Sequence, residues 1–159
     1  MTLVIEDGTG KTNSDSYVTV AEYNAFLNAR YVNRTSISEA QAEAYIFRAT
    51  DYFENQMFVG YVVDDDQAMQ WPRHNVVIDG FGIDSDEIPK EVKKSIYEIA
   101  YSFEQGYGIN DPVSRETQSE KIGEITITYK NSSASKVLLP AATQALRKIV
   151  KSSNTVVRV

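Results

Sequence analysis

The chain has 159 residues, of which 42% are hydrophobic and 24% are charged, and its formal net charge is −6 at pH 7. This length supports one hydrophobic core, and the composition is that of a folded rather than a disordered protein. Because the chain contains no cysteine, disulfide scaffolds, thiolate zinc sites and cysteine nucleophiles are excluded. We therefore expect a single domain over residues 1–159.

Residues 1–16 are predicted to form a flexible N-terminal segment, because Gly, Thr, Asn, Ser and Asp dominate residues 7–16. Leu3-Val4-Ile5 runs directly into Glu6 and Asp7, so we do not expect a secretion signal, which has a basic region and a longer apolar one. Gly10-Lys11-Thr12 resembles the end of a phosphate-binding loop, but Ile5 stands where that motif requires a glycine. The sequence therefore argues against a nucleotide site here.

Residues 17–106 are predicted to form a helical body. Thr19 with Glu22, and Ser38 with Gln41, match capping boxes that begin two helices. Pro89 suits the first position of a third helix. The apolar stripes of the three helices follow at helical spacing: Val20, Tyr23, Leu27 and Tyr31; Ala42, Tyr45, Ile46, Ala49, Tyr52 and Phe53; Val92, Ile96, Ile99, Ala100 and Phe103.

Between the second and third helices, residues 58–87 are predicted to be an irregular connector with a short helical turn over residues 67–70. The single tryptophan, Trp71, lies in this connector and precedes Pro72 and Arg73. We interpret Trp71 as a buried anchor, with Arg73 able to stack on its ring. A contact between subunits through Trp71 and Arg73 is the alternative.

The C-terminal part of the chain is predicted to contain a β-hairpin over residues 113–130, a helix over residues 140–152 and an extended tail over residues 153–159. Alternating apolar residues end at Tyr129 and predict the second strand, after a turn at Ile122-Gly123. The expected fold class is mainly α: a small bundle of about four helices with one hairpin and extended ends.

Charge is distributed unevenly along the chain. All 22 acidic residues lie at or before Glu124, whereas the segment from Ile125 to Val159 has six basic residues and no acid. Such a basic end suggests a tail for an anionic partner, or a subunit whose two ends attract each other in an assembly. A solvated amphipathic helix with clustered basic residues would give the same pattern.

No catalytic, metal or cofactor site is predicted. His74 is the only histidine, and no nucleophile motif accompanies it. The run Asp64-Asp65-Asp66 could attract a hard cation, but consecutive aspartates are expected to point in different directions. The longest apolar runs are far shorter than a membrane span. We therefore expect neither an enzyme nor a membrane protein.

An ordered series of motifs resembles the head-to-tail connector proteins of tailed bacteriophages, also described as head completion or adaptor proteins. Each motif is short, but they span nearly the whole chain in the expected order. The series consists of Glu6-Asp7-Gly8, Asn13-Ser14-Asp15-Ser16-Tyr17-Val18, Arg48-Ala49-Thr50-Asp51-Tyr52, Trp71-Pro72-Arg73, Ile88-Pro89 and Glu120-Lys121-Ile122-Gly123.

The resemblance implies a structural virion protein that is assembled in the host bacterial cytoplasm. Its subunits would form a ring, twelvefold like the portal protein beneath which it sits. The ring would extend the DNA channel, let DNA pass without specific binding, and receive a stopper or tail protein. Sequences of this type are also labelled DnaT-like, after a primosomal single-strand DNA-binding protein, which makes a replication accessory the alternative function.

Basic and apolar residues near the C-terminus are the predicted docking residues for a neighbouring subunit or the portal. In the alternative function, the basic members of this set would contact DNA, although an isoelectric point near 4.8 opposes autonomous DNA binding. The predicted docking residues are Lys136, Arg147, Lys148, Lys151, Val156, Val157 and Arg158.

Overall fold

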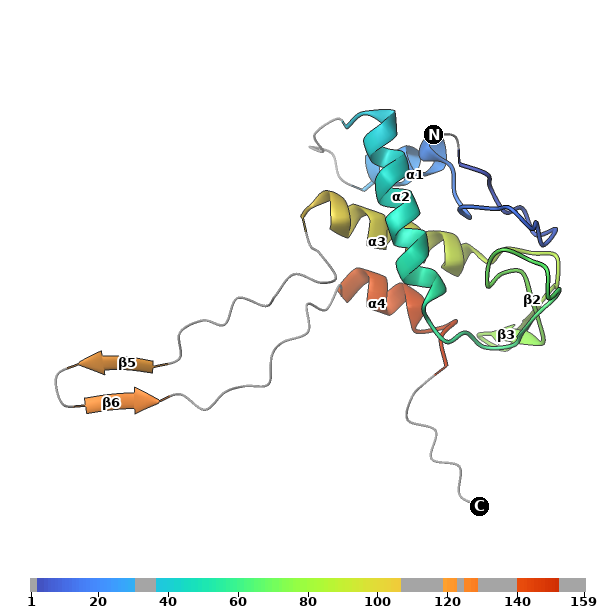
Figure 1. Ribbon diagram of the computed structural model, residues 1–159. Helices are drawn as coiled ribbons and strands as arrows, with labels where there is room; N and C mark the ends of the chain where they lie inside the picture. Colours follow the sequence, from blue (N-terminus) through green and yellow to red (C-terminus); the bar gives the residue numbers. More distant parts are fainter. Residues whose placement is uncertain (1–2, 31–36, 107–118, 123–124, 129–139, 152–159) are drawn as a thin grey trace, which may run out of the picture.

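The computed structural model describes residues 3–30, 37–106, 119–122, 125–128 and 140–151. It contains four helices, and α3 packs against both α2 and α4 (Figure 1). The mainly α fold class is therefore confirmed. Within the described ranges, no helix combines the length and apolar character needed to cross a membrane. The helices are α1 (Val20–Asn28), α2 (Glu39–Glu54), α3 (Lys90–Glu104) and α4 (Pro140–Leu146).

Both predicted capping boxes are present. The hydroxyl of Thr19 accepts a hydrogen bond from the backbone N–H of Glu22 at 3.1 Å, and the hydroxyl of Ser38 accepts one from Gln41 at 3.3 Å. The predicted apolar stripes supply most of the core, although Tyr31 lies outside the described residues. Pro89 occupies the N-cap position, just before the first residue of α3, whereas it was predicted to be that first residue.

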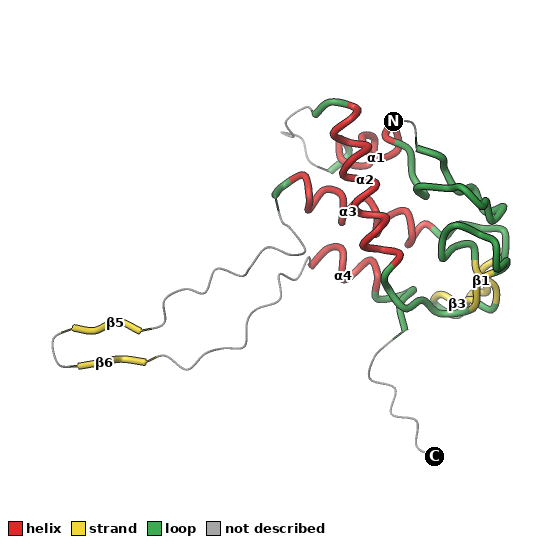
Figure 2. The backbone as a smooth tube through the Cα atoms, in the orientation of Figure 1, coloured by secondary structure: helices red, strands yellow, loops and turns green. Residues whose placement is uncertain are grey.

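The connector between α2 and α3 is more regular than predicted, because it folds into two small antiparallel hairpins (Figure 2). Asp79 and Gly80 both have positive φ, 53° and 88°, which is the geometry of a tight hairpin turn. No helical turn forms over residues 67–70. The strands are β1 (Tyr61–Val62), β2 (Arg73–His74), β3 (Val76–Ile78) and β4 (Phe81–Ile83).

The predicted C-terminal hairpin is present as β5 (Ser119–Ile122) and β6 (Ile125–Thr128). Ile122 pairs with Ile125, so the turn follows Ile122 and does not include it. Figure 2 shows this hairpin apart from the helices. The remaining residues of the predicted span, 113–118, 123–124 and 129–130, lie outside the described part of the chain.

The last helix is shorter than predicted. α4 ends at Leu146, and Val150 forms an antiparallel bridge with Phe58. The N–H of Val59 donates to the carbonyl of Ile149 at 3.0 Å, and the N–H of Lys151 donates to that of Met57 at 2.7 Å. The N–H of Val150 still donates to the carbonyl of Leu146 at 3.0 Å, whereas the bond from Lys151 to Met57 replaces the one that would continue the helix to Arg147. The predicted tail, residues 153–159, lies outside the described residues.

The N-terminal segment is a loop as predicted, but it is fastened to the body over residues 3–16. The carboxylate of Glu6, only 1% exposed, accepts hydrogen bonds from the N–H groups of Gly8, Gly10 and Lys11 at 2.7–3.0 Å. Gly8 has φ of 106°, and a Cβ added there would lie 1.9 Å from the carbonyl oxygen of Asp86. This close approach therefore requires glycine.

Candidate functional site

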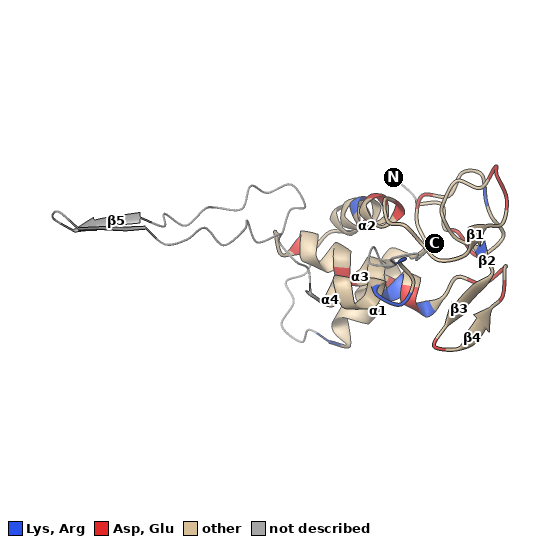
Figure 3. Cartoon of the chain, turned by 90° about the horizontal axis from the view of Figure 1, so that it is seen from below, with Lys and Arg blue, Asp and Glu red and all other residues tan. Residues whose placement is uncertain are grey.

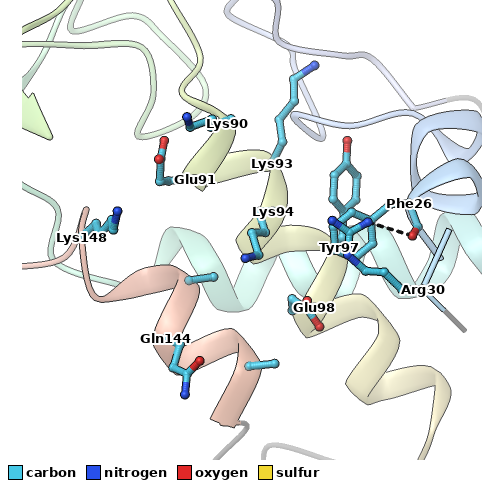
Figure 4. A pocket seen from close by; sticks show the side chains of 12 residues that line it. Phe26, Arg30, Lys90, Glu91, Lys93, Lys94, Tyr97, Glu98, Gln144 and Lys148 are labelled. Atoms are coloured by element: carbon cyan, nitrogen blue, oxygen red, sulfur yellow. Dashed lines mark hydrogen bonds between the residues drawn. The ribbon is translucent and has the colours of Figure 1, made fainter. Parts of the chain in front are cut away.

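A groove of about 700 Å³ lies where α1, α3 and α4 meet (Figure 4). α3 forms its floor between the other two helices. Lys90, Lys93 and Lys94 are three and four residues apart, so helical geometry places them on one side of α3. The lining residues are Phe26, Arg30, Lys90, Glu91, Lys93, Lys94, Tyr97, Glu98, Ala141, Gln144, Ala145 and Lys148.

The groove is basic on a protein that is acidic as a whole. Five of its lining residues are Lys or Arg, and two, Glu91 and Glu98, are acids. Figure 3 shows basic positions near α1 and α3, with others on α2 and β2, and acidic positions over helices and loops. The local charge therefore has the opposite sign to the net charge.

Two of the five basic side chains have acidic partners. The ammonium of Lys93 lies 2.8 Å from a carboxylate oxygen of Glu22, and Lys148 pairs with Asp79. The hydrogen bond from Lys148 to Asp79 raises the pKa of Lys148. Lys90 and Lys94 have no ion pair in the described part of the chain, and both are exposed. They are the groove cations most available to an incoming anion.

Aromatic rings and a guanidinium form the end of the groove near α1. The rings of Phe26 and Tyr97 lie 4.6 Å apart with an interplanar angle of 33°. The guanidinium of Arg30 lies 3.7 Å from the centre of the Phe26 ring and donates to the Phe26 carbonyl at 3.1 Å. Burial raises the pKa of Tyr97 to about 12, so its hydroxyl stays protonated. This end offers stacked planar groups next to a fixed positive charge.

The arrangement is suited to an anion that also carries flat rings. Lysine and arginine attract phosphate oxygens, and aromatic or guanidinium planes can stack on bases. Glu98 is next to Tyr97 on α3 and is only 7% exposed. Its carboxyl group in the lining opposes the binding of an anion and so limits the affinity. The groove places cations beside aromatic rings, a combination suited to binding such a ligand.

A second hollow, of about 570 Å³, lies next to the groove and shares Lys93 with it. Its lining is strongly acidic. The two hollows therefore divide this side of the molecule into a cation-lined part and a carboxylate-lined part. The carboxylates are those of Glu6, Asp7, Glu22, Asp84, Asp86 and Glu87.

Comparison with known families matches residues 1–159 to the family described as "Putative DnaT-like ssDNA binding protein". The chain belongs to this family. Comparison with curated proteins gave no significant match, and neither did comparison with solved structures. The family covers the whole chain, including the three helices that form the groove.

The structure places one predicted docking residue of this family member in the groove. Lys148 lines it from α4, whereas Arg147 and Lys151 are exposed outside it. The remaining predicted docking residues, Lys136, Val156, Val157 and Arg158, lie outside the described part of the chain. Of the described members, Lys148 alone lines the groove.

Trp71 and Arg73 are parts of the core and do not form a contact surface. Trp71 is fully buried and Arg73 is 7% exposed. The Arg73 guanidinium does not stack on the Trp71 ring. Instead it donates to the carbonyls of Val59, Gly60 and Gln70 at 2.8–3.0 Å. The interpretation of Trp71 as a buried anchor is confirmed, and the alternative of an intersubunit contact does not fit this burial.

The aspartate run also differs from expectation. The carboxylates of Asp64, Asp65 and Asp66 come within 4.8 Å of one another, so the prediction that they point in different directions is wrong. All three are exposed, and the Asp64 carboxylate accepts the N–H of Asp66 at 2.9 Å. Exposed loop carboxylates bonded to their own backbone are common without a metal.

Sequence reasoning overlooked the cations on α3. The sequence contains a signal for them, because the spacing of Lys90, Lys93 and Lys94 places these lysines on one face of an amphipathic helix. The predicted basic surface lay instead in the acid-free C-terminal segment, residues 125–159. Arg30 could be assigned to the groove only after α1 was placed against α3.

Proposed function

We propose that this protein binds single-stranded DNA and that the groove between α1, α3 and α4 holds the strand. The observation that carries the proposal is the lysine face of α3 next to the stacked Phe26 and Tyr97 rings. The description of the family to which the chain belongs supports the same class of ligand.

Each group of side chains in the groove matches one chemical part of a DNA strand. Lys90, Lys94 and Arg30 supply positive charge for the phosphates, and neutralising each phosphate releases condensed counterions. The exposed guanidinium of Arg30, which lies 3.7 Å from the centre of the Phe26 ring, supplies a plane on which an unpaired base can stack, and Tyr97, only 9% exposed, supports Phe26. Bases in a duplex are already stacked on each other, so the aromatic end favours a single strand.

The acidic body limits the strength of binding. A net charge of −6 repels nucleic acid at long range, and the acidic hollow beside the groove adds to this repulsion at short range. We therefore expect binding that depends steeply on salt and is confined to the groove. A protein with these properties would hold DNA transiently and would need a partner for stable loading.

The test is fluorescence anisotropy of a labelled oligothymidylate titrated with the protein at low and at raised salt. Binding at low salt that weakens with salt, and exceeds binding to a duplex of equal length, is expected. The triple variant Arg30→Gln, Lys90→Gln, Lys94→Gln should lose this binding while its thermal unfolding stays unchanged. Absence of binding at the lowest salt would overturn the proposal.

The second candidate function is the ring adaptor between portal and tail of a tailed bacteriophage. Exposed apolar side chains on the small hairpins favour it, since Tyr61, Val77 and Phe81 are 64%, 61% and 74% exposed. Such residues on an acidic protein are typical of surfaces that contact other subunits. In this function the protein would be part of the virion, assembled in the host cytoplasm, and would let DNA slide past an acidic lumen.

Electron micrographs of the protein mixed with a portal protein test the second candidate. Added density in the form of a ring on the portal, with the portal's twelvefold symmetry, is expected. Portal particles of unchanged length at saturating protein would contradict it. Both outcomes are independent of the anisotropy experiment, so the two functions can be judged separately.

A further inference from the structure

One acidic side chain in the lining of the groove is almost fully buried. Glu98 is only 7% exposed, yet its side chain lines the groove. In the described part of the chain its carboxylate accepts no hydrogen bond and forms no ion pair, and the Ser102 hydroxyl donates instead to the Glu98 backbone carbonyl at 2.8 Å. The only fully enclosed side-chain polar atom without a partner among the described residues is Nε1 of Trp71. The Glu98 oxygens are therefore still reached from the groove.

A carboxylate in these surroundings normally has partners. Buried polar groups are nearly always hydrogen-bonded, and a charged group without donors is costlier than a neutral one. Lys94 lies one helical turn before Glu98, at the spacing of an ion pair. The ion pairs of the described residues do not include one between these two side chains. The Glu98 carboxylate is therefore available to a ligand that brings hydrogen-bond donors of its own.

The part of a DNA strand that can supply these donors is a base. A phosphate has only acceptor oxygens and is repelled by the carboxylate. In Figure 4, Glu98 lies between Arg30 and Gln144, and all three side chains line the groove. A base that stacks on the Arg30 guanidinium keeps its edge free for hydrogen bonds to another side chain of the lining. Glu98 is thus suited to contact a base edge, while the lysines attract the phosphates.

The Watson–Crick edges of the four bases offer different groups to a carboxylate. Guanine has two adjacent donors, the N1–H and the 2-amino group, which match the two oxygens of one carboxylate in a bidentate pair. Adenine and cytosine each have an amino group beside a ring nitrogen that repels the carboxylate, and thymine has one N–H between two carbonyl oxygens. Guanine is therefore the best match, and its Watson–Crick edge is accessible only in an unpaired strand.

We propose that Glu98 gives the groove a preference for guanine, by accepting hydrogen bonds from the N1–H and the 2-amino group of an unpaired guanine. This inference rests on the proposed binding of single-stranded DNA and adds a base preference to it. Glu91, the other acid of the lining, is half-buried and lies on the same helix. It provides a matched control, because its replacement removes the same charge from the same groove.

Fluorescence anisotropy with three labelled oligomers tests the proposal. The first is oligothymidylate, the second carries guanine at isolated positions, and the third carries hypoxanthine at those same positions. Hypoxanthine keeps the N1–H of guanine but lacks the 2-amino group, so the last two oligomers differ only in that donor. The unchanged chain, Glu98→Gln and Glu91→Gln are titrated with each oligomer at low salt, and circular dichroism verifies the folding of both variants.

The unchanged chain should bind the guanine oligomer about tenfold more tightly than the hypoxanthine oligomer, because one hydrogen bond to a charged acceptor is lost. Glu91→Gln should keep this ratio. Glu98→Gln should lose it and still bind oligothymidylate at least as well as the unchanged chain, since a repelling charge is gone.

Two results would overturn the base preference alone: equal binding of the guanine and hypoxanthine oligomers by an unchanged chain that does bind oligothymidylate, or a ratio that persists in Glu98→Gln. Both would leave the proposed function standing. Failure of the unchanged chain to bind any of the oligomers would overturn the proposed function and the preference together.

Discussion

The hydroxyl of Tyr17 donates a 2.5 Å hydrogen bond to Oε1 of Glu54 and accepts the backbone N–H of Trp71 at 3.0 Å. Tyr17 is fully buried, and burial raises its pKa well above the usual range. This hydroxyl connects the loop before α1, the end of α2 and the connector. It therefore holds together three segments that are distant in sequence.

Tyr17→Phe should lower the free energy of unfolding by about 1–3 kcal/mol, because it leaves a buried N–H and a partly buried carboxylate without this partner. Urea denaturation followed by circular dichroism measures the loss. Tyr45→Phe is the matched control, since the Tyr45 hydroxyl, on α2, has no hydrogen bond in the described part of the chain. Equal stability of Tyr17→Phe and the unchanged chain would contradict the role of the hydroxyl.

The carboxyl of Glu54 should make stability depend on pH. Burial raises its pKa above the ordinary 4.5, although hydrogen bonds from Tyr17 and the N–H of Gln70 oppose the rise. Just above pH 4.5 the folded state therefore binds more protons than the unfolded state, and this contribution to stability is lost as pH rises through the folded pKa. Glu54→Gln should remove it, so the unfolding free energy of the variant should fall less over that window. Parallel pH profiles would refute the assignment.

Lys94→Gln tests the charge of the groove. Removing one phosphate contact should lower the slope of log affinity against log salt by about 0.7 for a single strand. Anisotropy titrations at several salt concentrations give the slope. Lys151→Gln removes an exposed lysine outside the groove and should leave the slope unchanged. Identical slopes for all three proteins would show that the strand lies elsewhere.

Phe26→Leu tests the stacking end of the groove. Leucine keeps an apolar side chain against Tyr97 but removes the ring that holds the Arg30 guanidinium. The weakened stacking of a base on that guanidinium should cost about 1–3 kcal/mol of binding free energy. The matched control is Phe47→Leu, which changes a phenylalanine of α2 that is 37% exposed and does not line the groove. If the two variants bind oligothymidylate equally well, the Phe26 ring does not support a stacked base.

Helices and their buried faces could be predicted from local sequence. Thr19 with Glu22, and Ser38 with Gln41, begin α1 and α2 as predicted, because a capping box is a signal contained in four residues. The alternation of apolar and polar residues before Tyr129 indicated β6, because this pattern too is contained in a few consecutive residues. These features depend only on residues that are close together in the chain, so they can be recognised from the sequence.

The small hairpins and the end of α4 were harder to predict. The Asp79-Gly80 turn was a usable hairpin signal, but its strands are too short for periodicity to reveal them. α4 ends early because Ile149, Val150 and Lys151 bond or pack against the segment after α2, a contact distant in sequence. The groove likewise depends on α1 and α4 meeting at α3. No local pattern could place Arg30 beside Tyr97.

The central claim is that the strand lies in the groove, and amide chemical shifts measured during titration with oligothymidylate test it most directly. If the strand lies in the groove, the signals that move should belong mainly to residues 90–98 of α3, to Phe26 and Arg30, and to residues 144–148. Shifts confined to residues outside this set, or no shifts at low salt, would contradict it.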